Sequence, residues 1–461
     1  MKITIKNLGP LRQAEFSLGD LTIICGQNNT GKTYATYALF GFLQTWRDML
    51  SISISEVVVD CLLTEGSTSV DVGSILTDAS KILEFGCQMY SSRLPSVFAA
   101  APERFKDSEF SVSVNLEQDL LNEKYEHRIK SATTDLFTLS KQIDSPLLQV
   151  TLLVSKGRIQ IPKDAISRVI TDALKEIVFG KIFPRPFIAS AERTGAAIFR
   201  KELNFAKNRI LEELGQKSKS IDPFDLLTKA FDDYALPVKV NVDFTRDIES
   251  IAKQSSFIAE EHPGILGDFA DIIGGEYTVT RNDELYYVPK GKKIKLSMDE
   301  SSSAVRSLLD IGFYLRNVAQ RGDLLMVDEP ELNLHPENQR RVARLFARLV
   351  HLGIKVFITT HSDYIIKELN TLIMLHQDKP HLKAIAEREG YRREELLEAS
   401  GIKVYIAEEA PVMVDGGKRK IRCQTLTPAD IQPDVGIEAR SFDSTIEKMN
   451  QIQEEIIWAD R

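Results

Sequence analysis

Several features are scarce or missing in this 461-residue sequence. Its four cysteines, Cys25, Cys61, Cys87 and Cys423, include no C-x-x-C pair of the kind that binds zinc or does redox work. No apolar run approaches the roughly 18 residues of a membrane-spanning helix, and Met1–Lys6 lacks the apolar stretch of a secretory signal. The simplest expectation is therefore a cytoplasmic protein with reduced thiols and no membrane contact.

The charge balance also disfavours one class of protein. Lys and Arg number 58 against 66 Asp and Glu, and a net charge of −8 argues against a protein that coats nucleic acid with its whole surface. The net charge does not exclude a local basic groove that binds DNA. Basic clusters at Lys290–Lys293 and Lys418–Arg422 have no interleaved aromatic residues, so solvated loops are preferred there over phosphate contacts.

The most informative stretch is a glycine-rich loop, G-Q-N-N-T-G-K-T, which follows the apolar run Leu21–Cys25 and precedes a helical pattern that reaches about Trp46. A strand, then G-x-x-x-x-G-K-T, then a helix is what a phosphate-binding P-loop requires. Backbone N–H groups at the helix start point at the phosphates, while the Lys reaches the β- and γ-phosphates and the Thr ligates Mg²⁺. The residues expected to bind nucleotide are Gly26, Asn28, Asn29, Thr30, Gly31, Lys32 and Thr33, the last also as a metal ligand. An incidental Gly- and Asn-rich turn is the alternative.

Two carboxylates follow a second apolar run. Leu324–Val327 has the composition of a buried parallel strand, which would deliver Asp328 and Glu329 to the ligand-binding edge of the sheet. There Asp328 is placed to hold Mg²⁺ and Glu329 to deprotonate the attacking water. A solvated Asp-Glu turn would be preferred if this passage stood alone, but the P-loop favours the functional interpretation.

A histidine follows the next apolar strand. His361 follows the predicted strand Lys355–Thr359, and at that edge its side chain would contact the γ-phosphate. A histidine with only a structural role is the alternative. Ser301–Ser303 precede a predicted helix at Ser307–Val318, where hydroxyl groups serve as plain N-caps or present donors to a phosphate.

Apolar strands that alternate with helices indicate an α/β fold with a largely parallel sheet. Residues 1–46, 185–195 and 275–400 are assigned to the nucleotide-binding core. Residues 47–184 and 196–274 are interpreted as mostly helical insertions, although Val112–Leu116 and Leu148–Val154 look like strands. Residues 401–461 are expected to form a C-terminal extension that closes the core.

The order of Gly26–Thr33, Ser301–Arg306, Asp328-Glu329 and His361 resembles ABC-type ATPases of the SMC/RecF/OLD group. The passage Asp328–Pro336, with its Glu-Pro-Glu-x-x-x-His-Pro form, is similar as well. The resemblance covers about residues 1–45, 185–195 and 295–370. It implies a P-loop NTPase of the ABC or SMC-head type, with a mixed β-sheet core and an inserted helical subdomain, that hydrolyses ATP with Mg²⁺.

The resemblance also implies an assembly. Ser302 and Ser303 would belong to a signature motif that completes the ATP site of the opposite subunit, so hydrolysis would need a homodimer or higher oligomer. Ala304 departs from this motif because a Gly is common there. Glu192 stands where the group carries its Q-loop glutamine and is expected near the metal, with a structural Glu192–Arg193 pair as the alternative.

The length of the sequence and the motifs that it lacks indicate which subgroup of these ATPases it resembles. The sequence has no long heptad run of the SMC kind, only 100 residues follow His361, and Val404–Glu409 lacks the Glu-Gly of a Toprim nuclease. What remains resembles the stand-alone ATPase subunit of Septu-type antiphage systems and, more distantly, that of PARIS. This resemblance implies control of a separately encoded nuclease, of HNH type in Septu. The alternatives are a RecF-like DNA-binding ATPase of DNA repair and a nucleotide-sensing scaffold with negligible turnover.

Overall fold

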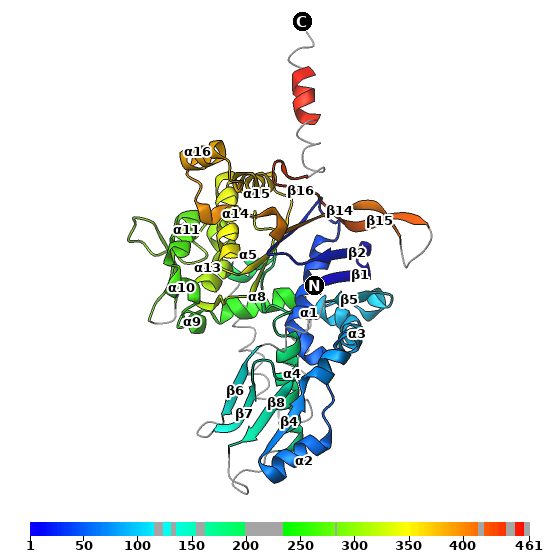
Figure 1. Cartoon of the computed structure of the whole chain (residues 1–461). Helices are drawn as coiled ribbons and strands as arrows, with labels where there is room; N and C mark the ends of the chain where they lie inside the picture. The colour runs from blue at the N-terminus through cyan, green and yellow to red at the C-terminus, as the bar shows by residue number, and fades with distance from the viewer. Residues whose placement is uncertain are drawn as a thin grey trace, which may run out of the picture. The chain divides into compact units, whose positions relative to one another are not determined.

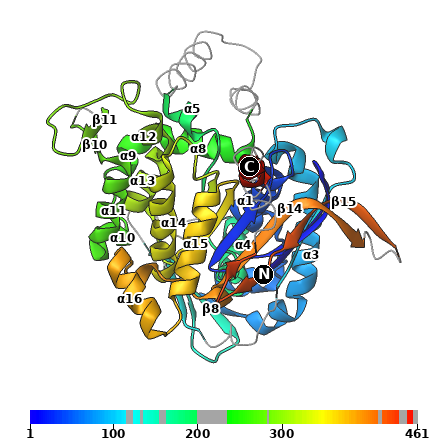
Figure 2. The ribbon, with the colours of Figure 1, turned by 90° about the horizontal axis from the view of Figure 1, so that it is seen from above.

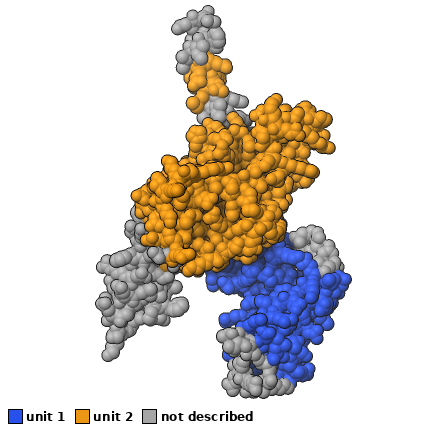
Figure 3. Space-filling model, turned by 90° about the vertical axis from the view of Figure 1, so that its left-hand side faces the viewer, with its two compact units in different colours: residues 1–4, 42–93, 109–184 blue, residues 5–41, 94–108, 185–461 orange. Residues whose placement is uncertain are grey.

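Figure 1 shows a computed structural model of the chain. It describes residues 1–114, 123–130, 135–153, 162–198, 234–281, 284–413, 419–438 and 448–455. The chain forms two compact units, coloured separately in Figure 3. Unit 1 comprises residues 1–4, 42–93 and 109–184, and unit 2 comprises residues 5–41, 94–108 and 185–461.

Unit 2 is built on a six-stranded sheet. Its strands lie in the order β15 (Lys420–Pro428), β14 (Ile402–Met413), β3 (Leu21–Cys25), β13 (Lys355–Thr360), β12 (Leu324–Asp328) and β9 (Pro186–Ala189). The five strands from β14 to β9 are parallel, and only β15 is antiparallel. Every residue of β3 and β12 is buried, which explains why both appear in the sequence as unbroken apolar runs. The predicted fold class, an α/β fold with a mixed sheet around the P-loop, is confirmed.

The strand register brings the predicted site together. Asp328 at the end of β12 lies opposite Thr359 of β13, and Thr360 lies opposite Cys25, the last residue of β3. Because these strands are parallel, the P-loop, Asp328 and His361 all leave the sheet at the same edge.

Helices cover this sheet. They are α1 (Lys32–Met49), which continues into unit 1, and α5 (Arg193–Ile198), α8 (Leu236–Arg246), α9 (Ile248–Ile251), α10 (Phe257–Glu261), α11 (Pro263–Ile273), α12 (Ser303–Ser307), α13 (Leu309–Phe313), α14 (Pro336–His351), α15 (Asp363–Leu375) and α16 (Pro380–Glu389). Figure 2 shows α14 and α15 side by side. The single helix predicted at Ser307–Val318 is instead divided among α12, α13 and a π-helical turn, Tyr314–Val318.

Further strands lie outside the six-stranded sheet. The hydrogen-bonded neighbours β1 (Lys2–Leu8) and β2 (Leu11–Ser17) precede β3, and β10 (Gly275–Val279) pairs with β11 (Leu285–Pro289). Leu296 makes one isolated antiparallel bridge with Tyr287 of β11.

The C-terminal extension contributes to the central sheet itself. β14 runs parallel to β3, with Ile402 opposite Leu21, and β15 returns antiparallel to β14 (Figure 1). Residues 414–418, 439–447 and 456–461 of this extension, and 199–233 of the second predicted insertion, lie outside the described residues.

Unit 1 combines helices with antiparallel strands. Its elements include α2 (Glu56–Glu65), β4 (Ser67–Asp71), α3 (Val72–Val97), β5 (Glu109–Ser113), β6 (Tyr125–Lys130), β7 (Asp135–Lys141), β8 (Leu147–Leu152) and α4 (Lys163–Phe179). The strands β4, β8, β7 and β6 form one sheet in that order (Figure 1). The predicted strand Leu148–Val154 overlaps β8 over Leu148–Leu152. The predicted strand Val112–Leu116 overlaps β5 only at Val112 and Ser113, and residues 115 and 116 lie outside the described residues. The strands β4, β6 and β7 were not anticipated. Among the described residues no helix is long and apolar enough to cross a membrane.

Candidate nucleotide-binding site

The predicted P-loop has the backbone that its glycines were expected to provide. Gly26, Asn29 and Gly31 have φ angles of +138°, +65° and +96°, and α1 begins directly afterwards at Lys32. A Cβ on Gly31 would come within 2.7 Å of Leu11 Cγ, and one on Gly26 within 2.7 Å of the Ala407 carbonyl oxygen. Both positions therefore require glycine for conformation and for space.

The Lys32 ammonium lies inside the curl of this loop. Its Nζ donates to the carbonyl oxygens of Gly26 and Gln27 at 2.9 and 2.7 Å. Burial lowers the pKa of Lys32, while the nearby carboxylates, chiefly Glu329 and Asp328, oppose this by favouring the charged form. The loop thus holds a cation that faces the acids at the end of β12.

The C-terminal extension supports the loop from outside. Gln424 of β15 donates from Nε2 to the Thr30 carbonyl oxygen at 3.1 Å, and the Thr30 hydroxyl donates to the Gln27 carbonyl oxygen at 2.7 Å. Asn28 and Asn29 are exposed at the tip. Nothing in the sequence around Gln424 pointed to this contact.

Asp328 is a buried carboxylate with one oxygen that accepts no hydrogen bond from the described residues. The Thr359 hydroxyl donates to its Oδ1, but Oδ2 has no hydrogen-bond partner among the described residues. Burial raises the pKa of Asp328 to about 6, an effect that the Thr359 hydrogen bond partly offsets. A lone buried carboxylate oxygen fits a divalent cation as ligand. No cluster of three His, Cys, Asp or Glu side chains exists for a metal within the described ranges.

Glu329 has a strained backbone and a reachable side chain. Its φ is +51°, which is unusual for a residue other than glycine. The N–H donates to the carbonyl oxygen and the hydroxyl of Thr359, at 3.2 and 3.1 Å. The side chain is 26% exposed, so a water molecule can approach its carboxylate.

His361 lies beside Glu329, held by a carboxylate that the sequence had not singled out. His361 Nδ1 is 3.8 Å from Glu329 Oε1 and 3.2 Å from Glu331 Oε1. The same Glu331 oxygen accepts the His361 backbone N–H at 2.8 Å and the Thr360 hydroxyl at 2.9 Å. Glu331 therefore fixes the turn that presents His361. The Glu-Pro-Glu passage was the available signal for it.

The weaker predictions divide into two groups. Glu192 accepts the Tyr37 hydroxyl at 2.9 Å, and its charge contributes to the raised pKa of Asp328, so it belongs to the acid edge. Ser302 instead caps α12 by accepting the Val305 N–H at 3.3 Å, and Ser303 is the first residue of that helix. Within this one chain, the described role of Ser302 is helix capping.

Arg193 is the main residue whose role the sequence did not reveal. It is only 1% exposed. Its Nε donates to the Ser307 carbonyl oxygen at 2.7 Å, and Nη1 donates to those of Ser190 at 2.8 Å and Asp328 at 2.6 Å. Nη2 donates to the Glu329 carbonyl oxygen at 2.8 Å. The expected alternative, a structural Glu192–Arg193 pair, is thus replaced by a set of backbone contacts.

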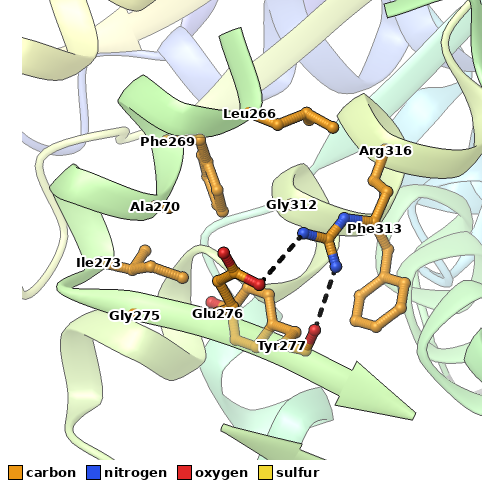
Figure 4. Close-up of a pocket in the computed structure, with 10 residues that line it drawn as sticks. All are labelled: Leu266, Phe269, Ala270, Ile273, Gly275, Glu276, Tyr277, Gly312, Phe313 and Arg316. Carbon is orange, nitrogen blue, oxygen red and sulfur yellow. Dashed lines mark hydrogen bonds and ion pairs between the residues drawn. The ribbon is translucent and has the colours of Figure 1, made fainter. Parts of the chain in front are cut away.

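A separate apolar hollow, drawn in Figure 4, is lined by α11, β10 and α13. Arg316 extends across it, donating to the Tyr277 carbonyl oxygen at 3.1 Å and lying 3.9 Å from Glu276. The Tyr277 hydroxyl donates to the Val305 carbonyl oxygen in α12. The hollow holds none of the predicted site residues, but one of its walls supports the serine-led helix.

Comparison with known proteins agrees with this geometry. Residues 1–366 match the family model described as the AAA ATPase domain. The chain belongs to this family. Membership implies nucleotide binding. No curated protein sequence matches the chain.

Solved structures of SMC heads are also similar to this chain. One is an SMC head bound to the C-winged helix domain of ScpA, with 13% identity, 92% and 97% of the two chains covered and a TM-score of 0.33. A second is an SMC head with an extended coiled coil, bound to the C-terminal domain of ScpA derived from Pyrococcus furiosus, with 14% identity, 99% and 98% coverage and a TM-score of 0.31. The SMC head domain from Thermotoga maritima has 9% identity, 93% and 98% coverage and a TM-score of 0.30.

Proposed function

We propose that this chain is an ATP-binding and ATP-hydrolysing subunit of an antiphage defence complex that controls a separately encoded nuclease. The observation that carries the nucleotide part is the convergence of Lys32, Asp328, Glu329 and His361 at one edge of the sheet, with the charges of both acids acting on Lys32. The nuclease part rests on the resemblance to Septu-type ATPases.

Each residue has a defined task in this proposal. The loop N–H groups and Lys32 bind the phosphates, exchanging the lysine's bonds to Gly26 and Gln27 for bonds to phosphate oxygens. Thr33 and Asp328 hold Mg²⁺, with Glu192 nearby; when bound, the metal neutralises charge on the phosphate oxygens.

The remaining two residues serve the water and the γ-phosphate. Glu329 takes the proton of the attacking water, and its backbone bonds to Thr359 and Arg193 fix its direction. His361 donates a hydrogen bond to the γ-phosphate, with its ring held by Glu331.

Assembly is part of the proposed mechanism. The Ser302–Ser303 segment makes its described hydrogen bonds within its own helix start, which leaves its exposed face for the nucleotide of a second copy. A homodimer or higher homo-oligomer would then contain composite sites, and formation or loss of these sites would signal to the nuclease, of HNH type in the preferred case.

Phosphate release from purified protein tests the proposal. It should be measured for the chain alone, with duplex DNA, and with the product of a neighbouring HNH gene. We expect slow turnover that the HNH protein changes and DNA does not. Stimulation by DNA alone would favour the RecF-like alternative, and ATP binding without turnover in any mixture would favour the nucleotide-sensing scaffold.

A further inference from the structure

The guanidinium of Arg193 is a buried cation whose described hydrogen bonds all end on backbone carbonyl oxygens. Removing a charge from water costs several kcal/mol unless a well-placed partner offsets it. Here the offset comes from four carbonyl dipoles and from the more distant charges of Asp328 and Asp310. An apolar side chain of similar size would fill the space without this desolvation cost. The role of Arg193 is therefore to fix the geometry of the groups it contacts rather than to stabilise the fold.

The four carbonyl oxygens belong to three different elements. Ser190 follows β9, Asp328 ends β12 with Glu329 directly after it, and Ser307 ends α12. The Ser307 hydroxyl adds a further contact between α12 and the segment after the acids, because its one proton is shared between the carbonyl oxygens of Ala304 at 3.0 Å and Leu332 at 3.2 Å. A shift of α12 cannot leave the acid edge unchanged unless these bonds break.

Glu329 is the residue most sensitive to such a shift. Its left-handed backbone is clamped on both sides, the N–H by Thr359 and the carbonyl oxygen by Arg193 Nη2. Strained conformations of this kind persist only where the surroundings impose them. Loss of the Arg193 bond would let the peptide relax and would turn the Glu329 carboxylate away from the water that it must activate.

We propose that Arg193 is a positioning residue that couples the serine-led helix α12 to Asp328 and Glu329. The inference rests on the proposed function, in which Ser302 and Ser303 of one copy contact the nucleotide of another. Engagement of α12 at the partner's site is passed through Arg193 to the acids of the chain's own site. The two ATP sites of a dimer are therefore energetically linked, and by reciprocity each influences the other.

Arg185 provides a matched control at the other end of the same strands. Its Nε and Nη2 donate to Asp323 Oδ1 and Oδ2 at 2.8 and 2.7 Å, and Nη2 also donates to the Val318 carbonyl oxygen at 2.9 Å. It too ties β9 to β12, but through an ion pair remote from the acid edge. Arg193→Lys and Arg185→Lys remove the same planar donor set from the two ends.

The test compares these variants by ATP affinity, kcat and the Hill coefficient for ATP hydrolysis. For Arg193→Lys we expect an affinity within about threefold of wild type, a Hill coefficient that falls to unity, and a kcat about 100-fold lower, since a misplacement of about 1 Å costs that much. Arg185→Lys should lower thermal stability and leave the Hill coefficient and kcat unchanged. Equal loss of kcat in both variants would reduce Arg193 to a structural role and overturn the inference.

Two further measurements keep the inference testable if Arg193→Lys does not fold. Arg193→Gln removes the buried charge but keeps two donors, so it should fold, bind ATP and show the same loss of cooperativity. In the wild type, amide exchange in residues 303–309 and 328–332 should slow together on ATP addition, and independent responses would contradict the coupling. A wild type without ATP binding would reject the proposed function, whereas a cooperative Arg193→Gln would reject only the role of Arg193.

Discussion

The two ends of the central parallel strands differ in whether their buried carboxylates have all their hydrogen-bond partners. At the amino end, buried Asp323 accepts hydrogen bonds from Nε and Nη2 of Arg185, from the Tyr314 hydroxyl at 3.1 Å and from the Gln320 N–H at 2.8 Å. The hydrogen bond to Asp323 raises the pKa of Arg185. At the carboxyl end, Asp328 Oδ2 and Glu331 Oε2 have no hydrogen-bond partner among the described residues.

The backbone differs in the same sense. Glu329 at the carboxyl end has a φ of +51°, and a buried arginine there meets carbonyl oxygens instead of a carboxylate. One end of the sheet has its polar groups satisfied and serves stability. The other keeps unsatisfied acceptors and a strained peptide, which are the features expected where a ligand and its metal complete the structure.

The largest expected effect comes from removing the base at the carboxyl end. Glu329→Gln should retain ATP binding and lower the single-turnover rate of phosphate release by about 100- to 10,000-fold, because the amide cannot take the proton of water. The matching change Glu337→Gln, at the exposed start of α14, should have no effect on the rate. Retained turnover in Glu329→Gln would remove the general-base assignment.

The buried carboxyl group of Asp310 allows the comparison to be tested through pH. Asp310 in α13 is buried, and burial raises its pKa from 3.8 to about 7, partly offset by the Thr245 hydrogen bond and the charge of Arg193. Between about pH 4 and pH 7 the native protein holds a proton that the unfolded chain has released, so its contribution to the free energy of unfolding falls as pH rises.

Asp310→Asn removes this dependence and still accepts the Thr245 hydroxyl. We expect the variant to be more stable than the wild type at pH 8, by up to about 4 kcal/mol, and the difference to vanish near pH 4. Chemical denaturation at both pH values measures it. A difference that does not change with pH would show that Asp310 is charged throughout in the folded protein.

At the amino end the expected effect is on stability alone. Asp323→Asn leaves Arg185 without its carboxylate and should lower the free energy of unfolding by about 2 kcal/mol, less than for a fully buried pair because the Arg185 side chain is 47% exposed. ATP affinity should stay at the wild-type value. A parallel loss of ATP binding would mean that the two ends do not differ in function as described.

The sequence revealed the carboxyl edge well because its chemistry is local. The runs before Gly26, Asp328 and His361 are buried parallel strands, which alternate with helices and carry their polar residues directly after the last apolar one. The strands β4 (STSVD) and β6 (YEHRIK) escaped prediction because they are polar, and none of their residues is buried.

Other contacts could not be predicted from the sequence. Arg193 and Gln424 donate to backbone carbonyl oxygens, which every residue has, so no pairing of residue types could indicate their partners. The place of β14 beside β3 depends on long-range pairing of Ile402 with Leu21. The break between α12 and α13 likewise reflects tertiary contacts, including the bond from Tyr277 to Val305.

The most direct test of the account is equilibrium binding of ATP to the wild type and to Lys32→Ala, with Mg²⁺ and with a chelator. If ligand and metal complete the carboxyl edge, the wild type should bind ATP saturably, and Mg²⁺ should strengthen the binding. Lys32→Ala should lose ATP binding but keep its melting temperature, because Lys32 bonds only loop carbonyl oxygens in the described structure. Equal ATP affinity of the two proteins would contradict the assignment of this edge as the nucleotide site.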